Sequence, residues 1–183
     1  SIHLAHAPKG GGTSNDKASG GDAGGIGGGW DVVIQMAGIT DGLNLFGGYS
    51  KITQEKDLDI GYTGHRNQIA LGATYAIGSL TFGYQHTKDS VSEVEGTNFY
   101  DNDAFGVSFN VNDDLSLSVG VHQSDKDNAV GTTISNDATS IQAAYSVGGA
   151  SLKIARTDVN NASYSTAVAN DKDGYTIALT LAF

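Results

Sequence analysis

The ten C-terminal residues, 174–183 (GYTIALTLAF), alternate without a break between large apolar side chains and small or hydroxyl side chains. The large residues stand at positions 175, 177, 179, 181 and 183, so a β-strand would carry all of them on one face. The opposite face would carry only threonine and alanine. Something must cover an apolar face of this kind, and that requirement limits what the chain can fold into.

The same two-residue period recurs from residue 30 onward, in segments whose connections alternate in length. Short connections lie near residues 40, 78, 113 and 148, and long ones follow residues 8, 51, 87, 124 and 157. The pattern predicts ten antiparallel strands in up-and-down order, with the long connections at one end. Residues 1–8 are expected to form a first short strand, 9–29 a Gly-rich long loop, and 30–183 the other strands. Phe46 breaks the alternation and is expected to point to the small-residue face.

Composition excludes several classes of protein. The net charge of −10 makes nucleic acid an improbable partner, because no local basic patch offsets it. The absence of cysteine removes disulfides, thiolate nucleophiles and cysteine-based zinc sites. No apolar run approaches the roughly 20 residues that a membrane-spanning helix needs.

Two kinds of fold can cover the apolar faces. A transmembrane antiparallel up-and-down β-barrel covers them with lipid, whereas a secreted or surface β-sandwich, as in an adhesin-type structural module, buries them against a second sheet. Nearly all acidic residues fall in the expected long loops, and the central apolar faces lack them. Aromatic residues, including Trp30, Tyr49, Tyr75, Tyr84 and Tyr145, fall toward expected strand ends, as in membrane-interface girdles. The barrel, with short periplasmic turns and long extracellular loops, is therefore the favoured interpretation.

Four segments carry a resemblance to a known family. They are residues 72–86 (GATYAIGSLTFGYQH), 100–122 (YDNDAFGVSFNVNDDLSLSVGVH), 140–154 (SIQAAYSVGGASLKI) and the ending 179–183 (LTLAF). Their order and spacing resemble the C-terminal half of Gram-negative general-diffusion porins, closest to the alphaproteobacterial and marine type. The resemblance covers residues 30–183 and does not extend to residues 1–29.

This resemblance implies a barrel of roughly sixteen strands in the outer membrane of a Gram-negative bacterium, in contact with lipid and lipopolysaccharide. It implies a homotrimer through which small hydrophilic solutes and ions diffuse passively. Ten strands are fewer than such a barrel needs. We therefore expect a C-terminal portion whose N-terminal strands come from a second chain, and a complete ten-stranded barrel is the alternative. The resemblance also implies that the insertion machinery reads a terminal signal, which here would be Tyr175, Ile177, Leu179, Leu181 and Phe183.

The parity of the alternation selects candidate pore-lining side chains. Polar residues with the parity of the small-residue face would line a water-filled lumen and bias which ions pass. These residues are Asp31, Gln35, Arg66, Gln68, Gln85, Asn110, His122, Lys126, Gln142 and Lys153.

We predict no catalytic residue, cofactor or defined metal site. The chain has no nucleophile elbow of the form Gly-x-Ser-x-Gly. His86 with Asp101 and Asp103 could imitate an outer-membrane protease site, but nothing else in the sequence supports that interpretation. Acidic stretches at residues 57–59 and 170–174 lack the ligand spacing of a calcium-binding hand, so we expect loosely bound Ca²⁺ at most.

Overall fold

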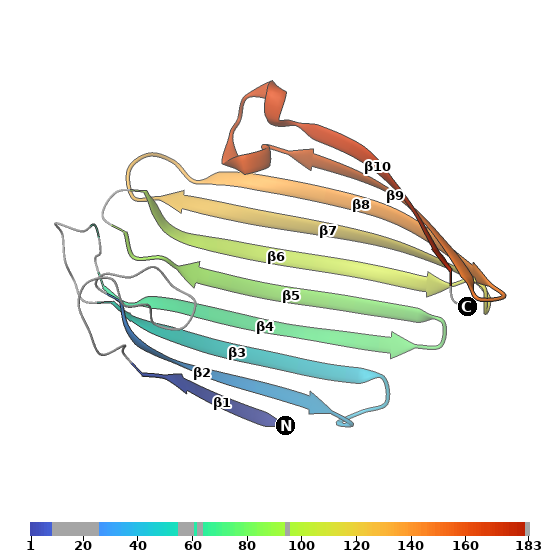
Figure 1. Ribbon diagram of the computed structural model, residues 1–183, viewed down its shortest axis with the longest axis horizontal. Helices are drawn as coiled ribbons and strands as arrows, with labels where there is room; N and C mark the ends of the chain where they lie inside the picture. Colours follow the sequence, from blue (N-terminus) through green and yellow to red (C-terminus); the bar gives the residue numbers. More distant parts are fainter. Residues whose placement is uncertain (9–25, 55–60, 62–63, 94–95, 182–183) are drawn as a thin grey trace.

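The computed structural model describes residues 1–8, 26–54, 61, 64–93 and 96–181. Ten strands form one antiparallel sheet, each paired with its neighbours in the chain (Figure 1). The all-β, up-and-down arrangement predicted from the sequence is confirmed at this level. The strands are β1 (Ile2–Ala7), β2 (Ile26–Ala37), β3 (Leu43–Gln54), β4 (Arg66–Ile77), β5 (Leu80–Ser90), β6 (Thr97–Asn110), β7 (Leu115–Asn128), β8 (Ile134–Val147), β9 (Ala150–Asn160) and β10 (Lys172–Leu181).

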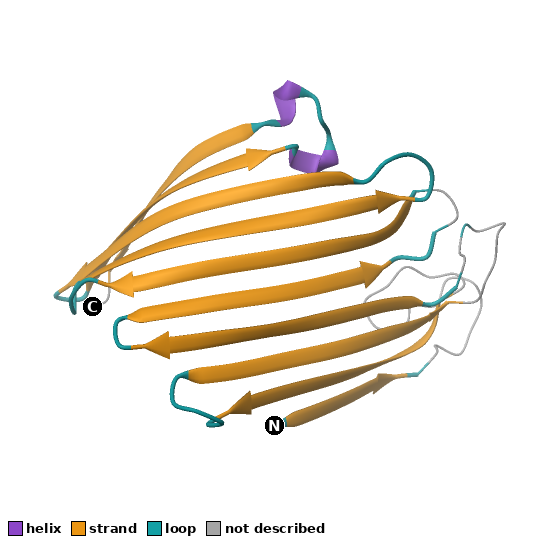
Figure 2. Ribbon diagram, turned by 180° about the vertical axis from the view of Figure 1, so that it is seen from behind, coloured by secondary structure: helices purple, strands orange, loops and turns teal. Residues whose placement is uncertain are grey.

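The connections alternate between the two ends of the sheet as predicted. The short turns after β2, β4, β6 and β8 gather at one end, which is here called the turn end (Figure 2). The strand ends that the longer connections join lie at the opposite end, here called the loop end. Two short 3-10 helices, η1 (Ala162–Tyr164) and η2 (Val168–Asn170), interrupt the connection between β9 and β10.

The register separates two chemically different faces. Residues paired across strands share a face, so each ladder can be followed from strand to strand. One row runs through Tyr75, Phe82, Val107, Val119 and Ile141, and it marks what we call the apolar face. Along each strand, the residues that alternate with these positions point to the opposite side of the sheet, which we call the polar face. On it, one row runs through Gly72, Gln85, Ala104, His122 and Ala138.

The sheet has no conventional core. Among the described residues, no large side chain is fully buried, and no second layer covers either face. Leu71 is 50% exposed and Ile141 is 64% exposed, although both lie within strands. The second sheet that a β-sandwich would need is therefore absent from the described part of the chain. No helix within these ranges is both long and apolar enough to cross a membrane.

Several strands extend further toward the loop end than the sequence predicted. The long loop expected at residues 88–102 shrinks to 91–96, and the loop expected at 125–137 shrinks to 129–133. Asp and Asn have low strand propensity, which is why these segments were assigned to loops. Cross-strand partners override that propensity: Lys88 faces Asp101, and Thr87 faces Asn102.

The Gly-rich loop predicted at 9–29 is also too long at its C-terminal end, because β2 begins at Ile26. Residues 9–25 lie outside the described residues. A register shift between Ile26 and Gly29 brings β2 close to β3. A Cβ atom at Gly27 would lie 3.0 Å from the Thr53 side chain, so glycine here permits close pairing of two strands.

The expectation that nearly all acids lie in long loops is wrong. Seven aspartates lie within strands and share the apolar face: Asp101, Asp103, Asp125, Asp127, Asp137, Asp158 and Asp173. We call them the acidic band. All seven lie in the loop-end half of their strands, with Asp103 nearest the middle as the seventh of the fourteen residues of β6, so the turn-end half of the described apolar face is free of acids.

Two glycines in the turn between β2 and β3 allow a direct test of this backbone geometry. Gly38 and Gly42 have φ values of +80° and +78°, but a Cβ at Gly42 would lie 2.0 Å from the Ala76 carbonyl oxygen, whereas a Cβ at Gly38 would meet nothing within 4 Å. We predict that Gly38→Ala costs about 1–2 kcal/mol, the left-handed backbone penalty alone. Gly42→Ala should cost clearly more, because the turn must also shift. Urea unfolding of both variants measures the difference in the free energy of unfolding, and equal losses would contradict the close approach.

Candidate functional site: the polar face of the sheet

The middle of the polar face is formed by very small residues. Gly83, Gly106 and Gly120 are paired in a row across β5, β6 and β7. Hollows of about 450 Å³ and 380 Å³ lie over this region. The larger one is lined by Phe46, Gln85 and His122 among others. Small side chains with hydrogen-bonding groups around them leave space that water can occupy.

All ten residues predicted to line a pore lie on this one face. The ladders connect Asp31 to Gln68 through Ser50 and Gln85 to His122 through Ala104. Gln142 pairs with Ala155 and Lys153 pairs with Ala144, which puts Gln142 and Lys153 on the same face. The same register puts the remaining four on that face: Gln35, Arg66, Asn110 and Lys126. Asn110 lies at the turn end, and Arg66 and Lys126 lie near the loop end. That they line an aqueous channel stays a prediction.

Phe46 lies on the polar face, as its broken parity predicted. It is paired with Gln35 on one side and Gly72 on the other. A Cβ atom at Gly72 would lie 2.2 Å from the Phe46 ring, so the ring lies directly over the glycine. The aromatic side chain thereby covers the backbone that the glycine would leave bare.

A charged cluster joins β4 and β5 on the polar face. The Arg66 guanidinium donates two hydrogen bonds to the Asp89 carboxylate, with Nε 2.8 Å from Oδ1 and Nη2 bonded to Oδ2. Gln68 Nε2 donates to Asp89 Oδ2 at 3.1 Å. Sequence reasoning selected Arg66 and Gln68 but missed Asp89, because it assigned residue 89 to a loop. This forked pair of hydrogen bonds holds the Arg66 side chain against the sheet, and the Asp89 carboxylate neutralises its charge locally.

The connection between β9 and β10 adds a residue that no periodic pattern could reveal. Tyr164, at the end of η1, has a hydroxyl 2.6 Å from Ser124 Oγ and a ring centroid 5.4 Å from that of Tyr100. Ser124 and Tyr100 both lie on the polar face. Asn161, Ser163 and Tyr164 have positive φ values of 54°, 60° and 54°. Residues other than glycine are strained in this left-handed conformation, so surrounding contacts must hold these three residues in place.

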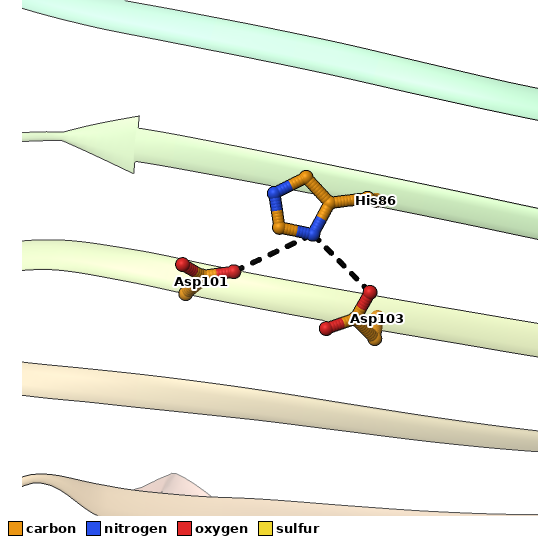
Figure 3. A group of neighbouring side chains, drawn as sticks. All are labelled: His86, Asp101 and Asp103. Carbon is orange, nitrogen blue, oxygen red and sulfur yellow. Dashed lines mark hydrogen bonds and ion pairs between the residues drawn. The ribbon is translucent and has the colours of Figure 1, made fainter.

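A different cluster lies on the apolar face, within the acidic band. His86 Nδ1 lies 3.2 Å from Asp103 Oδ1 and 3.5 Å from Asp101 Oδ1 (Figure 3). One potential ligand atom from each of the three lies within 4.8 Å of the others, which is close enough for a metal ion. Other groups already satisfy the carboxylates: Lys88 Nζ is 3.3 Å from Asp101 Oδ2, and the Tyr84 hydroxyl donates to Asp103 at 2.5 Å. This cluster is on the face opposite to the predicted pore lining.

Two tyrosines of the apolar face, Tyr84 and Tyr49, both direct their hydroxyls to polar side chains. The Tyr84 hydroxyl reaches Asp103, and the Tyr49 hydroxyl donates to Asn67 Oδ1 at 2.8 Å. The Tyr49 ring lies 5.2 Å from that of Trp30. Each of these tyrosines keeps its ring on the apolar face and its hydroxyl on a polar side chain. Amphipathic aromatic residues adopt this orientation at an interface between apolar and wet surroundings.

The residues of the predicted insertion signal share the apolar face of β10. Tyr175, Ile177, Leu179 and Leu181 are 70%, 72%, 65% and 52% exposed. Phe183 lies outside the described residues. β10 pairs with β9 along one edge, and no described strand pairs with its other edge. Whether a machinery reads these residues stays a prediction.

The acidic stretches considered for Ca²⁺ are placed only in part. Residues 57–59 lie outside the described residues. Asp171 accepts a hydrogen bond from the Asn161 backbone N–H at 3.0 Å, and Asp173 belongs to the acidic band. These two carboxylates therefore do not form one shared loop site.

Comparison with known proteins yields no assignment, because no protein-family model matches the chain and no curated protein matches it in sequence.

The Arg66–Asp89 pair allows a test of how firmly the polar face is cross-linked. The two side chains are 36% and 21% exposed, whereas those of Arg156 and Asp158, which form a single 2.9 Å contact, are 54% and 49% exposed. A double-mutant cycle on Arg66→Gln and Asp89→Asn compares free energies of unfolding. It should give a coupling energy of roughly 1 kcal/mol between the two side chains, and this coupling should fall as the salt concentration rises. The same cycle on Arg156 and Asp158 is the control and should give a coupling near zero. Equal couplings would contradict a special role for the forked pair.

Proposed function

We propose that this chain forms part of the wall of a water-filled pore in the outer membrane of a Gram-negative bacterium. The observation that carries the proposal is a single sheet with an uncovered apolar face on one side and a polar face of small residues on the other. Soluble monomers rarely expose contiguous apolar patches larger than a few hundred Å². Lipid would cover the apolar face, while water and diffusing solutes would occupy the polar side.

The lengths and chemistry of the strands suit a bilayer. Strands β2 to β10 have 10–14 residues, and a tilted membrane strand needs about 9–11. The turn-end half of the described apolar face is free of acids, and the acidic band lies in its loop-end half. A charge in the middle of a lipid-facing surface would be expensive, whereas a charge at the headgroup level is not. The acidic band would then lie at the outer membrane surface, where divalent cations can bridge carboxylates to lipopolysaccharide phosphates.

Closure of the pore requires strands beyond the ten. The outer edges of β1 and β10 have no partner among the described strands, so each presents free backbone N–H and C=O groups. In hydrocarbon every such group must be paired, and an open edge would be untenable there. Additional strands, from a second chain or another part of the same assembly, would complete a barrel of about sixteen strands, which we propose assembles as a trimer.

The function proposed for this assembly is passive diffusion of small hydrophilic solutes and ions. Gly106 and Gly120 border an open hollow on the polar face, beside the Phe46 ring that covers Gly72, so a path along this part of the face stays open. The charged and amide side chains around that path would bias which ions enter. This mode of transport needs no catalytic group and no cofactor.

The first experiment measures ion conductance. The assembly that carries this chain, extracted in detergent through an affinity tag, should produce discrete current steps in planar lipid bilayers. It should also migrate differently on gels before and after heating, as membrane barrels do. A preparation that is monomeric and stable in water without detergent, and that passes no current, would overturn the proposed function.

A matched pair of substitutions on β7 tests which face meets lipid. Val119 is on the apolar face, and its neighbour Ser118 is on the polar face. Val119→Arg should lower the free energy of unfolding from lipid vesicles by about 2–4 kcal/mol, because the guanidinium would lie in hydrocarbon. Ser118→Arg should leave that free energy nearly unchanged, since its guanidinium would be in water. Equal losses from the two variants would contradict lipid on one face and water on the other.

A further inference from the structure

The connection between β9 and β10, residues 161–171, folds into a compact loop that is tied at its base. The Asn161 backbone N–H donates to Asp171 Oδ1 at 3.0 Å, which joins the two ends of the loop. Asn161 Nδ2 donates to the Ser135 carbonyl oxygen at 2.9 Å and fastens the base to β8. Loops of this size with closed ends behave as small structural units.

From this base the loop reaches sideways across the polar face. Tyr164 contacts Ser124 on β7 and Tyr100 on β6, although the loop begins at β9. β7, which carries the Ser124 partner of the Tyr164 hydroxyl, is the second strand from β9, and strands are about 4.8 Å apart, so the hydroxyl lies about 10 Å in from its own hairpin. In Figure 1 the short helix that follows β9 lies next to the loop ends of β8 and β9, and the second short helix lies farther out and leads into β10. A loop that merely capped its own hairpin would make no such contacts.

A hydrogen-bonded chain holds Tyr164 in this position. Ser124 Oγ donates its single hydrogen to Asn102 Oδ1, so the Tyr164 hydroxyl must donate to Ser124. Asn102 Nδ2 in turn donates to Thr87 Oγ1 at 3.0 Å. Ser124 is only 3% exposed, and its partners leave it no missing hydrogen bond. The chain runs from the loop through β7 and β6 to β5, so the loop is anchored to three strands.

The same contacts gather a positive charge beside two aromatic rings. Tyr100 and Lys126 are direct cross-strand partners, and Lys126 Nζ lies 6.0 Å from the centroid of the Tyr164 ring. Within the described ranges, no carboxylate comes within 4 Å of Lys126 Nζ. Arg66, in contrast, is neutralised by Asp89. Lys126 therefore carries a positive charge that no described carboxylate neutralises. It lies on the part of the polar face that is next to the loop at residues 161–171.

We propose that residues 161–171 form a constriction of the pore, in which Tyr164 narrows the path and Lys126 gives it a preference for anions. This inference rests on the proposed pore function and names the residues that set its selectivity. A fixed cation at the narrowest point attracts anions and repels cations, and its effect grows as the surrounding water is displaced by aromatic rings.

Single-channel recording tests the constriction directly. Tyr164→Ala should raise the conductance, because it removes the ring that overhangs β6 and β7. Tyr164→Phe and Ser124→Ala each break the anchoring hydrogen bond while keeping the bulk, so they should increase current fluctuations rather than mean conductance. Tyr84→Ala is the matched control, since Tyr84 also hydrogen-bonds through its hydroxyl but lies on the apolar face, and its conductance should equal that of the unmodified protein.

The charge is tested by reversal potentials in a salt gradient. Lys126→Glu should shift the reversal potential toward cation preference. Lys153→Glu, on the same face but near the turn end of β9, should shift it less.

Because the chain contains no cysteine, Tyr164→Cys can also be modified by a sulfonate-bearing thiol reagent during recording. A drop in current then comes from channels that have already folded and inserted, so a folding defect cannot produce it.

The outcomes separate this inference from the proposed function. Unaltered conductance in Tyr164→Ala, or an unshifted reversal potential in Lys126→Glu, in a protein that does conduct would overturn the constriction and leave the pore intact. Absence of current from the unmodified assembly would overturn both. Raised conductance, a shifted reversal potential and block of Tyr164→Cys, with Tyr84→Ala unchanged, is the expected result.

Discussion

The structure depends on the two-residue period of its strands and on the absence of any layer that could cover the bulky half of that period. In most β proteins the apolar face of a sheet packs against another sheet or a helix, and burial there drives folding. Here the ten strands pair in one sheet, and large apolar side chains such as Ile141 and Ile177 remain mostly exposed. In the proposed pore, lipid covers this face and water lies on the opposite face.

The pairing between strands decides where charges can lie. Aspartate is a poor strand former, yet Asp101 and Asp103 are held in β6 because Lys88 and His86 face them across the ladder. The acidic band is therefore a product of register rather than of local propensity. It gives the apolar face a polar rim, to which the Tyr84 hydroxyl turns, while the Tyr49 hydroxyl reaches Asn67 on β4. Such a transition suits the proposed membrane setting, because a bilayer changes from hydrocarbon to headgroups over a short distance.

The polar face combines open space with a few fixed charges. Glycines in the middle rows of the polar face leave hollows. The Phe46 ring covers one glycine, Gly72, whose backbone would otherwise be bare. Arg66 is neutralised by Asp89, whereas Lys126 has no such partner among the described residues. The loop at residues 161–171 brings Tyr164 next to that lysine. The backbone of this loop is strained, and the hydrogen bonds through Ser124 and Asn102 offset that strain. Specific contacts therefore maintain the position of Tyr164.

The sequence by itself determined the strand class, the number and order of the strands, the alternation of short and long connections, and the face on which each predicted pore residue lies. These follow from parity and turn chemistry, which are local properties. Only the tertiary structure decided how far the strands extend and which residues meet across them, because the long connections leave the register open. The pairing of Asp89 with Arg66 and the position of the acidic band depend on that register, which also places His86, grouped with Asp101 and Asp103 from the sequence, opposite Asp103. Tyr164 was equally hidden, since a residue in an irregular loop has no period, and only contacts with strands distant in sequence show where it lies.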